Sequence, residues 1–214
     1  MSQTAAERAA LGKELLAVIN GGNPDHETVR RLIDAGAALE ETDGDVQNRT
    51  PLLAACSTSG CEDAARLLLQ AGAYIEARDQ NGATPLMMAV LMKNEEMVDL
   101  LIMHKAALDD TGFKNMTPLM WAANLNVRGI VQKLIDAGAD GDIVSSKGFK
   151  AADYADNNGK THLANEIEER LKIRKTARAD FAAALAAGMP LEKDVTPLRL
   201  PTVKRRPARP QGPR

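Results

Sequence analysis

Thr84-Pro85-Leu86 is one of three identical triplets in this chain of 214 residues, and the others are Thr50-Pro51-Leu52 and Thr117-Pro118-Leu119. The triplets stand 34 and 33 residues apart, and a degenerate copy, Lys150-Ala151-Ala152, follows at the same spacing. A constant period of this length is typical of stacked supersecondary units. We therefore expect a repeat protein that acts through an extended surface instead of a single pocket.

Each triplet predicts the start of a helix. A threonine hydroxyl can accept a hydrogen bond from a free N–H of the first turn, and proline suits the first helical position because its missing N–H breaks no helical bond. A second apolar run follows each start, as in residues 97–102, with helical spacing. Ala-Gly-Ala at 35–37, 71–73 and 137–139 then supplies a glycine stop. Each unit is predicted to be helix, turn, helix and loop.

In this register the chain resembles the ankyrin repeat family, whose repeats run roughly G-x-T-P-L-H-x-A-A and later V-x-x-L-L-x-x-G-A. Residues 81–86 and 147–150 carry the first pattern, and the likeness covers about residues 11 to 170. It implies an all-α ankyrin repeat solenoid of about five helix–turn–helix repeats joined by hairpin-like loops. The expected organisation is a repeat domain over 1–170, a helical extension over 171–190 and a disordered basic, proline-rich tail over 191–214.

The chain departs from the family pattern at two kinds of position. The histidine usual after the triplet is replaced by Leu53, Met87, Met120 and Asp153, and the glycine stop of the third repeat is replaced by Lys105. A non-glycine residue in the left-handed conformation costs about 1 kcal/mol. We therefore predict that the third repeat is the least stable of the stack.

A helical extension is expected after the repeats. Leu163, Ile167 and Leu171 are four residues apart and complete the second helix of the fifth repeat, and residues 177–187 continue as a helix that stops at 188–190. The end of a repeat stack needs a cover for its apolar side, so the extension is interpreted as a cap. A helix that binds a partner is the alternative.

Charge is concentrated at the end of the chain. The net charge is −2, yet residues 201–214 contain no acid and five cations, namely Lys204, Arg205, Arg206, Arg209 and Arg214. A proline-rich segment of this kind cannot build a core. It is either a solvated end or an electrostatic contact for nucleic acid, an acidic protein or an anionic surface, which leaves a tethered adaptor as the alternative function.

Enzymatic motifs are missing from the sequence. His26, His104 and His162 fall in different repeats, and there is no phosphate-binding glycine loop and no H-E-x-x-H. Cys56 and Cys61 have no second pair at metal-ligand spacing and are interpreted as small apolar residues of a reducing cytosol. We expect no enzyme activity, cofactor or metal, a cytoplasmic location without a membrane span, and a monomer.

The family resemblance assigns a binding surface to the loop tips and the outer turns of the first helices. In the third and fourth repeats these positions are rich in large apolar residues, which are frequent in interfaces. For Met116 and Trp121, packing within the stack is an equally open alternative. A non-enzymatic module that binds a partner protein on its concave face is predicted, with contacts from Arg78, Gln80, Asn81, Leu91, Met92, Phe113, Lys114, Met116, Trp121, Asn124, Leu125 and Phe149.

Overall fold

The computed structural model describes residues 4–42, 44 and 47–186, which form ten α-helices, one short 3-10 helix and no strand. The elements are α1 (Ala5–Asn20), α2 (His26–Asp34), α3 (Pro51–Ser57), α4 (Glu62–Gln70), α5 (Pro85–Leu91), α6 (Glu95–Met103), η1 (Phe113–Asn115), α7 (Pro118–Asn124), α8 (Arg128–Ala137), α9 (Ala151–Asn157) and α10 (Thr161–Ala186).

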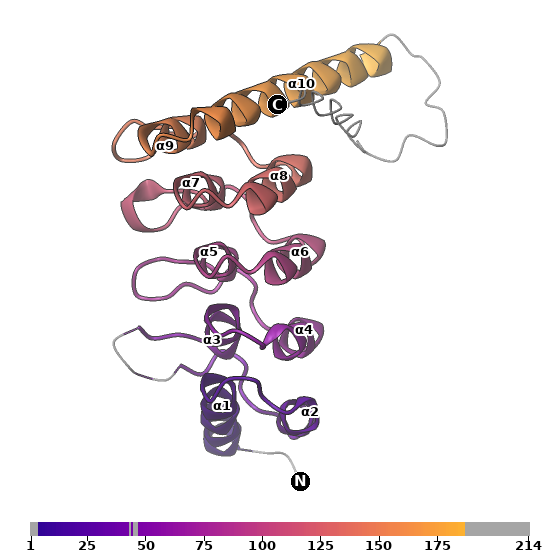
Figure 1. Cartoon of the computed structure of the whole chain (residues 1–214). Coiled ribbons are helices and arrows are strands. Elements are labelled where there is room, and N and C mark those ends of the chain that lie inside the picture. The colour runs from indigo at the N-terminus through magenta and orange to yellow at the C-terminus, as the bar shows by residue number, and fades with distance from the viewer. Residues whose placement is uncertain (1–3, 43, 45–46, 187–214) are drawn as a thin grey trace, which may run out of the picture.

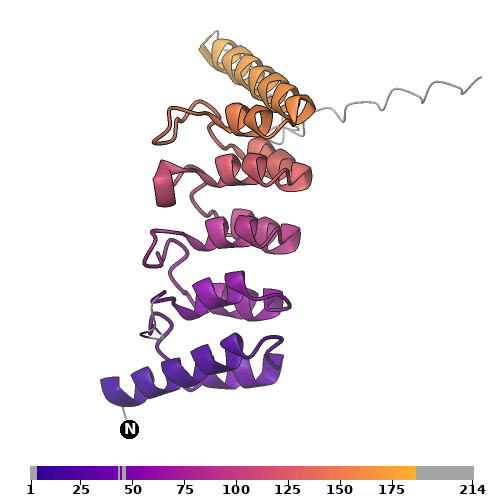
Figure 2. The ribbon, with the colours of Figure 1, turned by 60° about the vertical axis from the view of Figure 1, so that its left-hand side comes forward.

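The helices stack in two columns, and this arrangement confirms the predicted solenoid (Figure 1). The first helices α1, α3, α5, α7 and α9 contact one another in chain order, and α2, α4, α6, α8 and α10 do the same. The pairs α1–α2, α3–α4, α5–α6, α7–α8 and α9–α10 are repeats 1 to 5. The connecting loops project together on one side of the stack (Figure 2).

The three triplets start helices as predicted. Thr50, Thr84 and Thr117 are extended N-cap residues, and each hydroxyl accepts a hydrogen bond from the backbone N–H three residues later, at 3.5, 3.4 and 3.3 Å. Each following proline occupies the first turn. The degenerate copy uses a different cap, because the Asp153 carboxylate accepts from the Lys150 backbone N–H at 2.7 Å.

The predicted left-handed stops are also present. Gly36, Gly72 and Gly138 have φ of 84°, 90° and 128°, and Lys105 at the equivalent place of repeat 3 has φ of 67°. Backbone N–H groups of the Lys105–Ala106 turn still bond the carbonyls of α6, at 3.0 Å each. Repeat 3 therefore keeps the shape of its neighbours while a lysine adopts a conformation that favours glycine.

The core is a continuous layer of alanine and aliphatic side chains between successive pairs. Leu53, Met87 and Met120, which replace the usual histidine, are each 1% exposed or less. Cys56 and Cys61 are buried and free. Burial raises the pKa of both thiols, and the neighbouring Cys61 raises that of Cys56 further. Both side chains thus serve as small apolar groups in the folded protein.

The described parts of the loops form a regular series of turns without strand pairing. Each of the last three turns is closed by a backbone bond between residues four apart, Asp79 to Ala83, Gly112 to Met116 and Ser145 to Phe149, at 3.0 to 3.2 Å. Neighbouring loops are joined because the Gln80 N–H donates to the Gln47 carbonyl and the Ser146 N–H donates to the Lys114 carbonyl. These bonds hold the loop tips at fixed positions beside the first helices.

Candidate functional site: an apolar groove across repeats 3 and 4

A groove of about 370 Å³ lies between the loop tips and the first helices of repeats 3 and 4. We call it the repeat 3–4 groove, and its lining residues are Gln47, Asp79, Asn81, Ala83, Met87, Met88, Leu91, Phe113 and Trp121. Helix α5 supplies the two methionines and Leu91, while α7 supplies Trp121. The loops before α3 and α5 supply the polar edge of Gln47, Asp79 and Asn81, and the loop before α7 supplies Phe113. The walls are therefore apolar, with polar groups along one side.

The groove offers large apolar side chains to a ligand. Phe113 is 54% exposed, whereas Leu91, Met88 and Trp121 are partly buried, and Met88 and Trp121 also pack against the core. Methionine adapts to irregular apolar shapes, and tryptophan is frequent among residues that dominate binding energies. Pockets for small ligands or anchoring side chains have this size and this mixture of walls.

Phe113 is held outward by the turn that carries it. Lys114 and Asn115 have φ of 60° and 56°, a conformation rare outside glycine, and the Asn115 N–H donates to the Gly112 carbonyl at 2.9 Å. The Lys114 ammonium lies 4.8 Å from the centre of the Phe113 ring, at the distance of a cation–π contact. The turn thus presents an aromatic ring with a positive charge beside it.

The turn also packs tightly against repeat 3. A β-carbon on Gly112 would lie 2.8 Å from the Met87 sulfur and 3.1 Å from the Gly82 carbonyl oxygen. A larger residue at position 112 would make Met87 and the Gly82 carbonyl shift, so the Phe113 turn is closely packed against repeat 3.

Four of the predicted contact residues meet in this groove, namely Asn81, Leu91, Phe113 and Trp121. Met116 is placed elsewhere: it is 3% exposed and belongs to the core. The expectation that Met116 faces a partner is therefore wrong, and the alternative of packing within the stack holds for it. The physical reason is its position directly before the N-cap threonine, where Ala83 in repeat 3 is also buried.

Arg78 is occupied by bonds within the protein. Its guanidinium donates to the Gly82 and Thr111 carbonyls at 3.1 and 3.0 Å and to the Asp110 carboxylate at 2.5 Å. These contacts join the loops of repeats 3 and 4 at the place where other loop pairs use a backbone bond. Arg78 therefore helps to hold the loops of repeats 3 and 4 together.

The remaining predicted contacts do not line the groove. Gln80 and Lys114 are exposed at loop tips, and Met92, 48% exposed, follows the end of α5. Leu125 is partly buried, and the Asn124 carbonyl and side chain both accept from the Asn158 amide at 3.1 Å. Phe149 is partly buried, with its ring 5.7 Å from that of Tyr154 in an edge-on contact. The four tail residues Lys204, Arg205, Arg206 and Arg209 lie outside the described residues.

Met87 and Met88 were not predicted as groove residues. Met87 stands at the position of the usual histidine and forms part of the groove floor, and Met88 is one helical turn before Leu91. The spacing of Met88, Leu91 and Met92 places them on one side of α5, which is a signal that the sequence contains.

The acidic loop residues act as connectors between repeats. The Asp109 carboxylate accepts from the Asp140 N–H at 2.7 Å, and Asp110 pairs with Arg78. Within the described residues no group of three or more histidine, cysteine or acidic side chains could hold a metal ion. The described helices also include none that is long and apolar enough to cross a membrane.

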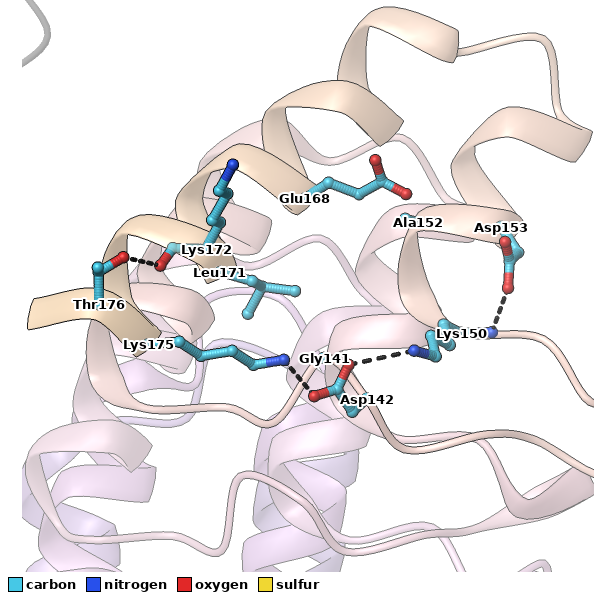
Figure 3. A pocket seen from close by; sticks show the side chains of 10 residues that line it. All are labelled: Gly141, Asp142, Lys150, Ala152, Asp153, Glu168, Leu171, Lys172, Lys175 and Thr176. Atoms are coloured by element: carbon cyan, nitrogen blue, oxygen red, sulfur yellow. Dashed lines mark hydrogen bonds and ion pairs between the residues drawn. The ribbon is translucent and has the colours of Figure 1, made fainter. Parts of the chain in front are cut away.

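A second depression, of about 380 Å³, lies where α9 and α10 close the stack (Figure 3). Asp142 lies between two cations and accepts from Lys150 at 3.2 Å and from Lys175. Hydrogen bonds from Lys175 and then Lys150 lower the pKa of Asp142. Leu171 points into the same depression and lies over Gly141, where a β-carbon would be 2.0 Å from it (Figure 3). This arrangement fastens α10 to the loop of repeat 5 through Asp142.

Comparison with protein families identifies the stack. The family model described as ankyrin repeats in three copies matches residues 14–79 and 76–145, which is more than half of the chain. The chain belongs to the ankyrin repeat family. Ankyrin repeats are protein-interaction modules and are typically non-catalytic, and no catalytic family is found.

Curated relatives of this ankyrin repeat protein include neurogenic locus notch homolog proteins. The chain is 32% identical over 175 residues to Neurogenic locus notch homolog protein 2 of Homo sapiens, an alignment that covers 75% of this chain and 7% of the relative. It is 39% identical over 94 residues to Neurogenic locus notch homolog protein 1 of Xenopus laevis, covering 44% of this chain and 4% of the relative. The chain therefore spans only a small fraction of these relatives.

Proposed function

We propose that this ankyrin repeat protein is a non-enzymatic adaptor or regulator that docks an apolar segment of a partner protein in the repeat 3–4 groove. The observation that carries the proposal is the convergence of Leu91, Phe113 and Trp121 on one groove whose loops are fixed by inter-repeat bonds. A preformed surface binds with little change of shape, so less free energy is lost in ordering the site.

The protein contains a single tryptophan, Trp121, which lines the groove and can report its occupation. A partner recovered with the wild-type chain from its source cells would be purified and titrated against it. We expect the Trp121 emission to shift to shorter wavelength when an apolar segment covers the indole. Phe113→Ala should weaken binding by about 2 kcal/mol, the magnitude typical of a dominant interface residue.

Tyr74 supplies a matched control for that experiment. It is an aromatic residue, 60% exposed, that does not line the groove, so Tyr74→Ala should leave binding unchanged. Circular dichroism would check that both variants keep the helical content of the wild type. A partner that binds the Phe113→Ala variant as tightly as the wild type, without a change in Trp121 emission, would contradict the proposed site.

The basic tail is the second candidate for the site that binds a partner. Its five cations without an acid favour nucleic acid, an acidic protein or an anionic surface. A chain truncated after residue 200 distinguishes the two functions. Partner binding through the groove should persist in the truncated chain, whereas binding through the tail should disappear. Binding of the full chain through the tail should also weaken steeply as the salt concentration rises.

A further inference from the structure

Methionine side chains differ widely in their access to solvent. Four of the described methionines are 3% exposed or less, namely Met87, Met97, Met116 and Met120. Met92 and Met103 are 48% and 64% exposed, and Met88 is partly buried. A thioether is oxidised in the folded protein only where an oxidant reaches its sulfur. Oxidation without unfolding is therefore expected at Met88, Met92 and Met103.

Met88 is the one of these three that lines the repeat 3–4 groove. It lies on α5, where it forms part of the apolar wall together with Leu91, and Trp121 lines the same groove. Met87 also lines the groove, but it is 1% exposed, and its sulfur would lie 2.8 Å from a β-carbon on Gly112. An oxidant that enters the groove therefore meets Met88 as its accessible sulfur.

Oxidation changes the chemistry of that wall. A lone pair of the Met88 sulfur attacks one oxygen of hydrogen peroxide, the O–O bond breaks, and the departing hydroxide takes up the proton of the transferred oxygen and leaves as water. The thioether is oxidised by two electrons to a sulfoxide, and the peroxide is reduced. A sulfoxide is polar, and covering it with an apolar ligand costs free energy because its oxygen loses water without gaining a hydrogen bond.

We propose that Met88 is a redox switch of the repeat 3–4 groove: hydrogen peroxide converts its thioether to the sulfoxide, and the oxidised groove no longer holds an apolar segment tightly. A methionine sulfoxide reductase restores the thioether, since two thiols become a disulfide while the oxygen leaves as water. This switch rests on the proposed docking function, because it regulates the same groove. The fold is kept during the change, since the core methionines are out of reach of the oxidant.

The test uses the full chain and N-phenyl-1-naphthylamine, an uncharged apolar dye whose emission rises when water is excluded from it. Trp121, the single tryptophan, can transfer excitation energy to dye bound beside it in the groove. The reduced protein should show this transfer, and Phe113→Ala should weaken it. After treatment with peroxide, and removal of the excess by catalase, the dye affinity should fall about tenfold. Incubation with methionine sulfoxide reductases and dithiothreitol should restore it.

Substitutions separate the role of Met88 from that of the other methionines. Met88→Leu keeps an apolar wall without a sulfur, so it should bind the dye equally before and after peroxide. Met88→Gln places a polar amide in the wall and should bind weakly without any oxidant. Met92→Leu and Met103→Leu are the matched controls, because each removes an exposed methionine that does not line the groove, and both should lose affinity on oxidation as the wild type does. Peptide mass spectrometry identifies the oxidised sulfurs.

The outcomes distinguish the switch from the site that it controls. Absent energy transfer in the reduced protein, or transfer that Phe113→Ala leaves unchanged, would contradict the apolar groove itself and with it the switch. Unchanged dye binding after peroxide, with the sulfoxide present at Met88, would overturn the switch and leave the groove standing. The switch is also wrong if Met88 stays unoxidised while Met92 and Met103 react, if Met88→Leu loses affinity like the wild type, or if circular dichroism shows that peroxide unfolds the protein.

Discussion

Lys105 shows how one residue can weaken a repeat without changing its shape. Its φ of 67° belongs to the region that glycine occupies at Gly36, Gly72 and Gly138. The backbone bonds of the turn are all made, so the cost is conformational and not a lost hydrogen bond. In a solenoid each repeat contacts only its neighbours, so a local cost lowers the stability of repeat 3 and its two interfaces first.

Lys105→Gly should raise the free energy of unfolding by about 1 kcal/mol, because glycine adopts the left-handed conformation without the clash of a β-carbon. Lys105→Ala is the control, since it removes the side chain but keeps the β-carbon, and it should leave stability near that of the wild type. Urea titration followed by circular dichroism measures both. If both variants raised the free energy of unfolding equally, the effect would come from the lysine side chain instead of the backbone conformation.

At the scale of elements, the N-terminal end of the stack depends on close packing between α1 and the loop that follows α2. Helix α1 begins with a reciprocal cap between Thr4 and Glu7, and Gly12 in its middle faces the loop after α2. A β-carbon at Gly12 would lie 2.5 Å from the Ala38 carbonyl oxygen and 2.8 Å from the Glu41 β-carbon. Both are backbone or near-backbone atoms, so the clash can be relieved only by moving α1 or the loop away from each other.

Gly12→Ala should therefore destabilise the protein by about 1 to 3 kcal/mol, the range for an overpacked contact. Helix propensity alone predicts the opposite sign, because alanine in a helix interior is favoured over glycine by about 1 kcal/mol. Thermal unfolding by calorimetry measures the change. Lys13→Ala, at the exposed neighbouring position, should stay within about 0.5 kcal/mol of the wild type. A stabilised Gly12→Ala protein would show that α1 is free to shift away from the loop.

At the scale of the whole molecule, carboxylates hold the last pair to the stack. Glu166 on α10 lies 2.6 Å from the Arg128 guanidinium and accepts from the Gln132 amide at 2.7 Å. Burial raises its pKa, but the bonds from Arg128 and Gln132 outweigh burial, and the net pKa is lowered below the usual 4.5. The pKa of Asp142 is lowered in the same way by Lys175 and Lys150.

Acid should therefore loosen α10 before the rest of the stack. Groups with a lowered folded pKa stabilise the protein above their unfolded value, and this contribution is lost as the pH falls below about 4.5. Hydrogen exchange at about pH 6 and about pH 3, corrected for intrinsic rates, should show the largest loss of protection in α9 and α10. Glu166→Gln should be less stable near neutrality and should lose less protection on acidification. A larger loss of protection in α1 to α4 than in α9 and α10 at low pH would contradict this prediction.

The fold was predictable from the sequence because its signals are local and repeated. Thr84, Pro85 and the glycine stops act within a turn of the residues that they cap, so the period placed the start of each first helix from the second repeat onward. The helical extension was also expected, although α10 runs unbroken from Thr161 to Ala186. The predicted division at residue 170 and the predicted end at 188–190 remain predictions, since residues 187–214 lie outside the described part.

The site was predictable only in part, because burial depends on neighbours that are distant in the chain. The register of the repeat pattern placed Leu91, Phe113 and Trp121 on the surface formed by the loop tips and the first helices. In the structure, these three residues line one groove. The same register did not distinguish Met116, which faces inward beside its N-cap threonine, from Phe113 three residues earlier.

The chain's own pattern of caps, stops and apolar positions is sufficient for an ankyrin stack of five helix pairs, because each signal acts over a few residues and recurs with the period. Three-dimensional packing settles what the surface presents. Arg78 is taken up by the next loop, and the Phe113 ring is turned outward. These features depend on contacts between residues about one repeat or more apart, which no local pattern encodes.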